Sequence, residues 1–129
     1  MNDRNRRNIL ILDPERDTAE LFARALETHQ HSCKCYWVRS TQDARSLLAE
    51  IPFDFLLADL SLLQQDQFLL IETIQELAAN TSIVVDGYMN QKEDILAALK
   101  MGVTTYFIKP VMVNTLRKLI DDLAEPLPA

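Results

Sequence analysis

Glycine is rare in this sequence, which contains only Gly87 and Gly102 among 129 residues. A loop that holds phosphate on its backbone N–H groups needs closely spaced glycines, so we do not expect such a loop. Cysteine is equally rare, and Cys33 with Cys35 is too small a set for a disulfide framework. Two residues apart on a strand, these cysteines would share a face without meeting disulfide geometry, which favours free thiols in a reducing compartment.

Long apolar runs and an excess of positive charge are also missing. The 13 Lys and Arg residues are outnumbered by 19 Asp and Glu, giving a net charge of −6, whereas nucleic-acid binding requires clustered positive charge. After the basic residues Arg4, Arg6 and Arg7, the apolar run 9–12 ends at Asp13. That run is shorter than the roughly 7 residues of a signal peptide core or the roughly 20 that span a bilayer. We therefore expect a cytoplasmic protein that contacts neither nucleic acid nor membrane.

The residues that are present suit one folded domain. Apolar residues make up 48% of the chain, which is enough for a core. We assign residues 1–7 to a basic tail and residues 8–124 to the domain. Residues 125–129 contain two prolines and are interpreted as a C-terminal tail or the start of a linker.

Short apolar or β-branched runs alternate with segments of helical periodicity. The predicted strands are 8–12, 33–38, 53–60, 82–85 and 103–108. The predicted helices are 17–28, 41–50, 68–79, 91–101 and 113–123. Ser40 or Thr41 is expected to cap the second helix, and Gly102 to end the fourth. This alternation predicts an α/β fold, with a parallel sheet covered by helices on both faces.

Several polar residues stand where the predicted strands end. They are Asp13, Asp59, Asp86 with Gly87, and Lys109. Ligands of open α/β sheets bind beyond the carboxyl ends of the strands, so these side chains are expected to converge. Carboxylates together with a lysine suit a divalent cation and a phosphoryl group.

Three segments carry a resemblance to a known family. They are ILILDPERDTAELF, FDFLLADLSLLQQDQFLL and GVTTYFIKPV. In this order they resemble the receiver domains of two-component response regulators, from about residue 8 to about residue 123. The resemblance implies a flavodoxin-like, doubly wound sheet of order 2-1-3-4-5 with five helices. It places Asp59 at the phosphoacceptor, Lys109 at the active-site lysine, Pro110 at a cis-proline and Tyr106 at an aromatic switch.

The resemblance also implies partners and a cofactor. Asp59 would accept a phosphoryl group from a histidine kinase or a phosphotransfer protein. Mg²⁺ would be held by Asp13, Asp59 and the backbone carbonyl of Ser61. An output domain would follow Ala129 or act as a separate effector protein, and a homodimer could form through residues 91–101, 103–108 and 113–123.

The sequence departs from the family pattern around the metal. The family has an adjacent pair of acids after the first strand, and its second member ligates the metal. Here the pair is Asp13-Pro14, and proline has no side-chain oxygen. We therefore expect weak Mg²⁺ binding, reduced about tenfold or more by the missing charged ligand. Glu15 or Asp86 could replace that ligand, although Asp86-Gly87 is also a common turn pair.

A second departure concerns the switch. Gly87 stands where the family has Thr or Ser, so no hydroxyl can contact the phosphoryl group. The gap that glycine leaves predicts that Tyr106 lies inward permanently. Leu63 and Gln67 also replace the usual proline and glycine after the phosphoacceptor. The open alternative is a pseudo-receiver, a protein-interaction module that works without phosphorylation.

Enzymatic readings fit less well, and we expect no enzyme. The segment ILILDPE is weakly similar to the nucleophile strand of haloacid-dehalogenase-type phosphatases, which needs a second acid that Glu15 only approximates. No Ser/Thr/Gly-rich loop supports a flavin site. The alternating residues His29, His31, Cys33 and Cys35 cannot close around one metal, because alternate strand residues lie about 6.6 Å apart.

Overall fold

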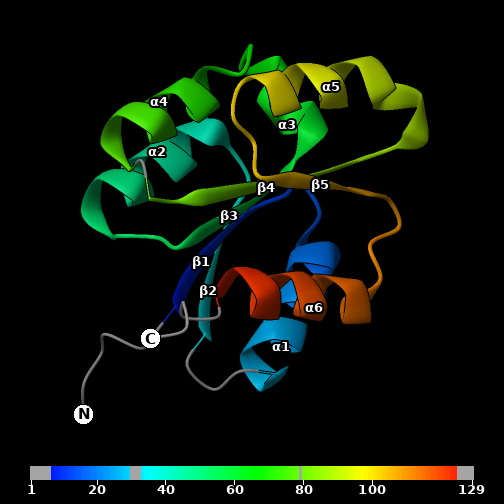
Figure 1. Cartoon of the computed structure of the whole chain (residues 1–129). Coiled ribbons are helices and arrows are strands. Elements are labelled where there is room, and N and C mark those ends of the chain that lie inside the picture. Colours follow the sequence, from blue (N-terminus) through cyan, green and yellow to red (C-terminus); the bar gives the residue numbers. More distant parts are fainter. Residues whose placement is uncertain (1–6, 30–32, 79, 125–129) are drawn as a thin grey trace, which may run out of the picture.

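A parallel sheet of five strands, in the order β2-β1-β3-β4-β5, forms the centre of the protein (Figure 1). This computed structural model describes residues 7–29, 33–78 and 80–124. The strands are β1 (Arg7–Leu12), β2 (Cys33–Val38), β3 (Phe55–Asp59), β4 (Ser82–Gly87) and β5 (Thr105–Ile108). The predicted flavodoxin-like strand order is confirmed.

Helices cover both faces of this sheet. They are α1 (Arg16–His29), α2 (Thr41–Glu50), α3 (Leu60–Gln65), α4 (Leu69–Leu77), α5 (Lys92–Lys100) and α6 (Val113–Ala124), with a 3-10 turn, η2 (Met89–Gln91), before α5. Figure 1 shows α2, α3, α4 and α5 on one face and α1 with α6 on the other. None of the helices in the described part of the chain is long and apolar enough to cross a membrane.

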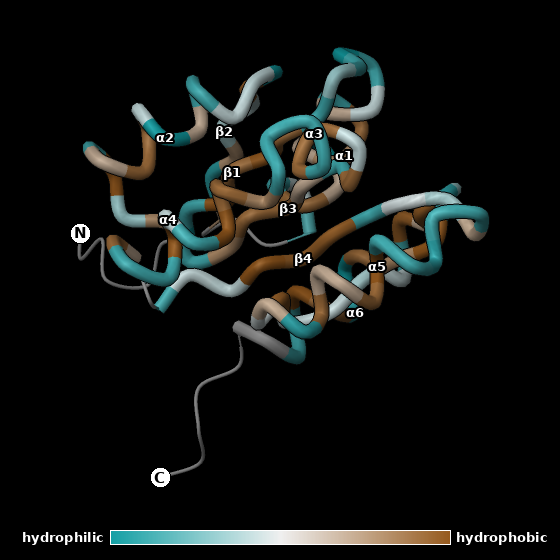
Figure 2. Tube along the Cα trace, turned by 90° about the horizontal axis from the view of Figure 1, so that it is seen from above, coloured by the Kyte–Doolittle hydropathy of each residue, from teal (hydrophilic) through white to brown (hydrophobic). Residues whose placement is uncertain are grey.

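Strict side-chain alternation on the central strands divides the core into two layers. Leu10, Leu12 and Val85 point into the layer under α2 to α5. Ile9 and Ile11 point into the layer under α1 and α6. Both faces of β1, β3 and β4 are covered, which explains their nearly continuous apolar sequences. In Figure 2 these strands run through the middle as hydrophobic segments, with polar helix surfaces outside.

Local signals set two helix ends as predicted. The Ser40 hydroxyl accepts a 3.1 Å hydrogen bond from the Asp43 N–H, so Ser40 is the N-cap of α2. Gly102 has a φ of +102° just after α5, a backbone conformation that an L side chain disfavours. The α5 helix therefore ends where the glycine permits.

The helix count was wrong, because the described residues contain six α-helices instead of five. Leu60, expected to end the third strand, and residues 61–65, expected to be a loop, form α3. The Asp59 carboxylate accepts a hydrogen bond from the Leu62 N–H and caps this helix, while Leu60 and Leu63 are fully buried. Capping and burial together make a short helix stable where family loop residues are absent.

The tails assigned from the sequence lie almost wholly outside the described residues. Arg7 is the exception, because β1 begins there, one residue before the predicted domain boundary. His31 also lies outside the described residues. Cys33 and Cys35 form no disulfide, as expected.

Candidate functional site

Three buried carboxylates meet at the carboxyl edge of the sheet. Asp13 directly follows β1, Asp59 ends β3, and Asp86 is the penultimate residue of β4. Each is at most 3% exposed, and carboxylate oxygens of all three lie within 4.8 Å of one another. The structure thus brings together all three acids that the sequence placed at strand ends.

Strand alternation explains why these acids share one face. Asp59 alternates with Leu57 and Asp86 with Val84, and both leucine and valine belong to the core layer under α1 and α6. Asp59 and Asp86 are also direct neighbours in the β3–β4 register. Because side chains repeat every two residues along a strand, the two carboxylates must extend the same face.

Lys109 completes the group from the end of β5. Its ammonium donates a hydrogen bond to Asp59 Oδ2 and forms an ion pair with it. Its backbone N–H bonds the Gly87 carbonyl at 2.8 Å, and its Nζ lies 5.0 Å from the centre of the Tyr88 ring. The Lys109–Pro110 peptide is cis, as the resemblance implied.

The electrostatics of the group follow from burial and mutual repulsion. Burial raises the pKa of Asp86 to about 7, although nearby Lys109 opposes the shift. Burial also raises the pKa of Asp13, against the hydrogen bond from the Glu15 N–H. Burial acts to lower the pKa of Lys109, but the hydrogen bond to Asp59 and the surrounding carboxylates outweigh it and leave that pKa raised. Positive charge in this site is therefore strongly favoured.

Asp13 is held in position from two sides. Its Oδ1 accepts a 2.8 Å hydrogen bond from the Glu15 N–H. Its backbone carbonyl accepts a 2.9 Å bond from the indole N–H of Trp37, on β2. Pro14 and Glu15 are both exposed, and Glu15 contributes no oxygen to the described acid group.

Two of the three acids, Asp13 and Asp86, line a hollow of about 310 Å³, and Asp59 is not among its lining residues. Lys109, Leu21 of α1 and Tyr88 after β4 also line this hollow. A small ion or a phosphoryl group could therefore reach Asp86 as directly as it reaches Asp13.

Gly87 faces the other layer, and its side-chain space is already filled. A Cβ there would lie 2.9 Å from Leu60 Cδ2 and 3.1 Å from Gln91 Oε1. The Gln91 amide accepts from the Tyr88 N–H at 2.8 Å and donates to the Ser61 hydroxyl at 3.1 Å. Gln91 thus links the first turn of α3 to the residue after β4, a role that no sequence motif indicated.

The expectation that Tyr106 lies inward was wrong. Tyr106 is 42% exposed on β5, an edge strand of the sheet. The space beside Gly87 that it was expected to occupy holds Leu60 and Gln91 instead. With that space filled, nothing draws the tyrosine ring into the core.

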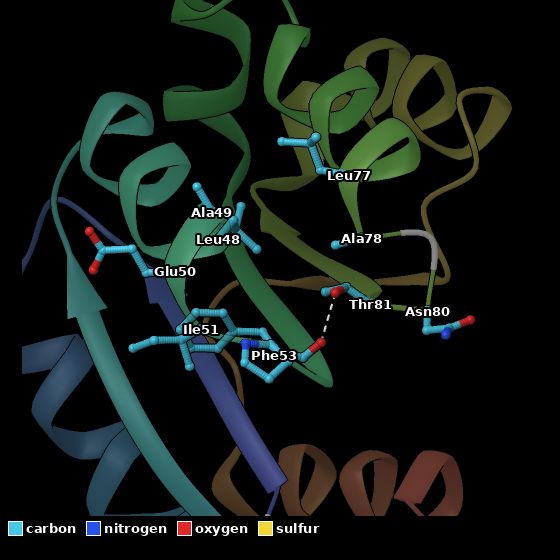
Figure 3. Close-up of a pocket in the computed structure, with 10 residues that line it drawn as sticks. Leu48, Ala49, Glu50, Ile51, Phe53, Leu77, Ala78, Asn80 and Thr81 are labelled. Atoms are coloured by element: carbon cyan, nitrogen blue, oxygen red, sulfur yellow. Dashed lines mark hydrogen bonds between the residues drawn. The ribbon is translucent and has the colours of Figure 1, made fainter.

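Another hollow, of about 390 Å³, lies at the opposite edge of the sheet (Figure 3). Leu48, Phe53 and Leu77 are among its lining residues. The Thr81 hydroxyl, drawn in the same view, donates a 2.7 Å hydrogen bond to the Phe53 carbonyl. No group of three potential metal ligands occurs there or elsewhere in the described chain apart from the three aspartates.

Comparison with known proteins identifies the family. Residues 9–121 match the response regulator receiver domain. The chain belongs to this family. The receiver is 30% identical over 116 residues to the response regulator protein PilR of Pseudomonas aeruginosa, covering 90% of this chain and 26% of PilR. It is 28% identical over 108 residues to the two-component response regulator PprB of the same species, covering 81% of this chain and 38% of PprB.

Solved receiver structures share its fold. The signal receiver domain of a DNA-binding response regulator from Colwellia psychrerythraea superposes with a TM-score of 0.82 at 24% identity, over 93% of this chain and 99% of that one. A CheY-like receiver from Methanospirillum hungatei gives 0.82 at 18% identity, over 92% and 94%. The receiver thus spans a quarter to two-fifths of the two curated relatives and nearly all of these two solved domains.

Proposed function

We propose that this receiver accepts a phosphoryl group on Asp59 from a phosphohistidine of a histidine kinase or phosphotransfer protein. The observation that carries the proposal is the position of Asp59. Its carboxylate is buried at the end of β3, hydrogen-bonded to Lys109 and adjacent to two further acids at the edge where α/β sheets bind ligands. If Asp59 had only a structural role, its ion pair with Lys109 would be enough, and two further buried acids beside it would only add repulsion.

The transfer itself requires little beyond positioning and charge. An Asp59 oxygen attacks the phosphorus, and a P–O bond forms as the donor's P–N bond breaks. The electron pair leaves with the ring nitrogen, which takes up a proton. Lys109 offsets the negative charge of the incoming phosphoryl oxygens, and the Leu62 N–H at 3.2 Å keeps Asp59 oriented.

A divalent cation fits the residues present. The unpartnered buried oxygen of Asp86 and the mutual closeness of three carboxylates call for a positive charge. Asp13 and Asp59 would hold Mg²⁺. The Ser61 carbonyl, which the resemblance implied as a further ligand, lies within α3, whose carbonyls point toward the C-terminal end of the helix and away from its N-cap Asp59. A Mg²⁺ ion bound at Asp13 and Asp59 would neutralise part of the negative charge on the phosphoryl oxygens.

One observation favours the alternative, a pseudo-receiver that works without phosphorylation. Leu60 and Gln91 fill the position from which the family's hydroxyl would report the phosphoryl group. Phosphorylation could then leave the outer surface unchanged. In that case partners would recognise one fixed state of α5, β5 and α6.

Intact mass after incubation with Mg²⁺ and acetyl phosphate tests the proposal. We expect one added phosphoryl group on the wild type and none on Asp59→Asn. An unchanged mass, together with an NMR spectrum that does not respond to beryllofluoride, would instead support the pseudo-receiver.

The proposed output involves the α5–β5–α6 face. Leu96, Tyr106 and Met112 are exposed around it, and apolar residues there could contact an output domain, a separate effector or a second receiver. Receiver domains act as signalling modules, and we propose no catalytic turnover for this one. Its proposed setting is the cytoplasm, with no direct contact to nucleic acid.

A further inference from the structure

Asp86 is an unusual residue for an interior strand of a parallel sheet. It is 2% exposed on β4, between Val85 and Gly87. Among the described residues, its Oδ2 is the one buried side-chain oxygen or nitrogen without a hydrogen-bond partner. A buried carboxylate oxygen without a partner is costly, so an aspartate with a purely structural role would have one.

The direction of this side chain suggests what the missing partner is. Asp86 extends the same sheet face as Asp59, its neighbour in the register, and its carboxylate joins those of Asp13 and Asp59 within 4.8 Å. Oxygens on opposite sides of a hard divalent cation lie about 4–5 Å apart, given metal–oxygen distances of about 2.0–2.6 Å. The three oxygens are therefore spaced to share one ion.

The charges agree with this geometry. When ionised, the three carboxylates outnumber the single ammonium of Lys109 by two negative charges. Lys109 is bonded to Asp59, whereas Asp86 Oδ2 has no donor. A divalent cation would balance the group and supply the partner that Asp86 lacks.

We propose that Asp86 is a metal ligand, replacing from β4 the carboxylate that Pro14 removes from the loop after β1. The cation is then held by Asp13, Asp59 and Asp86. The inference rests on the proposed function in that the same ion would serve phosphorylation of Asp59, but it concerns binding alone. Glu15 is not the replacement, because its side chain is exposed and its backbone already serves Asp13.

Cation titration without any phosphodonor tests the proposal. Trp37 is the single tryptophan, and its bond to the Asp13 carbonyl makes its fluorescence a local reporter. We expect the wild type to bind both Mg²⁺ and Mn²⁺. Trp37 fluorescence follows the Mg²⁺ titration, and electron paramagnetic resonance follows the Mn²⁺ titration. Asp86→Asn should weaken binding tenfold or more, whereas Asp122→Asn, which removes the same charge from the exposed surface of α6, should change it less than twofold.

A rescue variant separates ligation from general electrostatics. Adding Pro14→Asp to Asp86→Asn returns a carboxylate to the other side of the ion and should recover most of the lost affinity. If Asp86→Asn does not fold by circular dichroism, Asp86→Val, which matches the apolar residues beside it, takes its place. Unchanged cation affinity in the folded Asp86 variant would overturn the proposal.

The outcomes for binding and for phosphorylation are separable. Loss of cation binding in Asp86→Asn, with a wild type that acetyl phosphate does not modify, supports Asp86 as a ligand and refutes the phosphoacceptor proposal. Phosphorylation of the wild type, with cation binding intact in Asp86→Asn, supports the phosphoacceptor and refutes Asp86 as a ligand.

Discussion

The amino and carboxyl ends of the strands, called here the amino edge and the carboxyl edge of the sheet, differ in whether their buried polar groups have hydrogen-bond partners. At the amino edge, the Thr81 hydroxyl donates to the Phe53 carbonyl, and Asp54 accepts from the Asn8 N–H at 2.9 Å. At the carboxyl edge, three carboxylates crowd one lysine and Asp86 Oδ2 has no partner. The satisfied hydrogen bonds at the amino edge stabilise the fold. The crowded carboxylates at the carboxyl edge lower the stability of the fold and form a charged binding site.

The largest expected effect comes from removing the one positive charge at the carboxyl edge. Lys109→Met leaves three carboxylates without a counter-charge and should lower the free energy of unfolding by about 3 kcal/mol at neutral pH. Urea denaturation without divalent cations measures it. Lys100→Met, at an exposed position in α5, is the control and should change stability by less than about 0.5 kcal/mol. Equal effects of the two substitutions would contradict the contrast between edges.

The pH dependence of stability should expose Asp86. Its pKa is about 7 in the folded protein against 3.8 ordinarily, so between these values the folded state keeps a proton that the unfolded state releases. Stability without divalent cations should therefore fall as pH rises through this window, by at most about 1.4 kcal/mol per pH unit. Asp86→Val should flatten the slope and stabilise the protein at pH 7. If this substitution left the slope unchanged, the pH dependence of stability would come from groups other than Asp86.

Filling the space beside Gly87 should also destabilise the carboxyl edge. The Thr side chain of Gly87→Thr would press on Leu60, which is fully buried, and on Gln91. Overpacking of this kind costs about 1–3 kcal/mol, which thermal unfolding would show. Combining Gly87→Thr with Leu60→Ala should cost less than the sum of the two single effects, because the smaller residue makes room. Strict additivity would mean that Leu60 is not the obstacle.

Thr81→Val provides the matched test at the amino edge. The same type of change, polar to valine, removes the satisfied hydrogen bond to the Phe53 carbonyl and should cost about 1 kcal/mol. Asp86→Val should have the opposite sign at pH 7. Chemical denaturation of both variants under identical cation-free conditions gives the comparison, and effects of the same sign would show that the edges do not differ.

The smallest effect is expected outside both edges. Gln67 has a φ of +54°, where the family has glycine and where an L side chain is strained. Gln67→Gly should stabilise the protein by up to about 1 kcal/mol. Gln65→Gly, at the last residue of α3, where the backbone is still helical, should instead destabilise the protein by up to a similar amount, and the midpoints of urea unfolding distinguish the two.

Much of the fold was predictable from sequence, because periodicity reports how each element is buried. The alternation of strands and helices predicted the parallel sheet. Ser40 predicted the start of α2, and Gly102 predicted the end of α5. Helix α3 was missed because its stability comes from Asp59 as a cap and from burial of Leu60 and Leu63, which LSLLQQ does not reveal in isolation.

The site divides in the same way. The sequence by itself determined that Asp13, Asp59, Asp86 and Lys109 stand at strand ends, and that Pro14 and Gly87 remove expected oxygens. The strand register could have indicated that Asp86 shares a face with Asp59, since both alternate with core residues of one layer. Only the tertiary structure decided that Asp86 Oδ2 lacks a partner, that Leu60 and Gln91 fill the space beside Gly87, and that Tyr106 lies outward. These outcomes depend on how side chains from segments far apart in the sequence pack together in the same space, and the local sequence of one segment does not determine that packing.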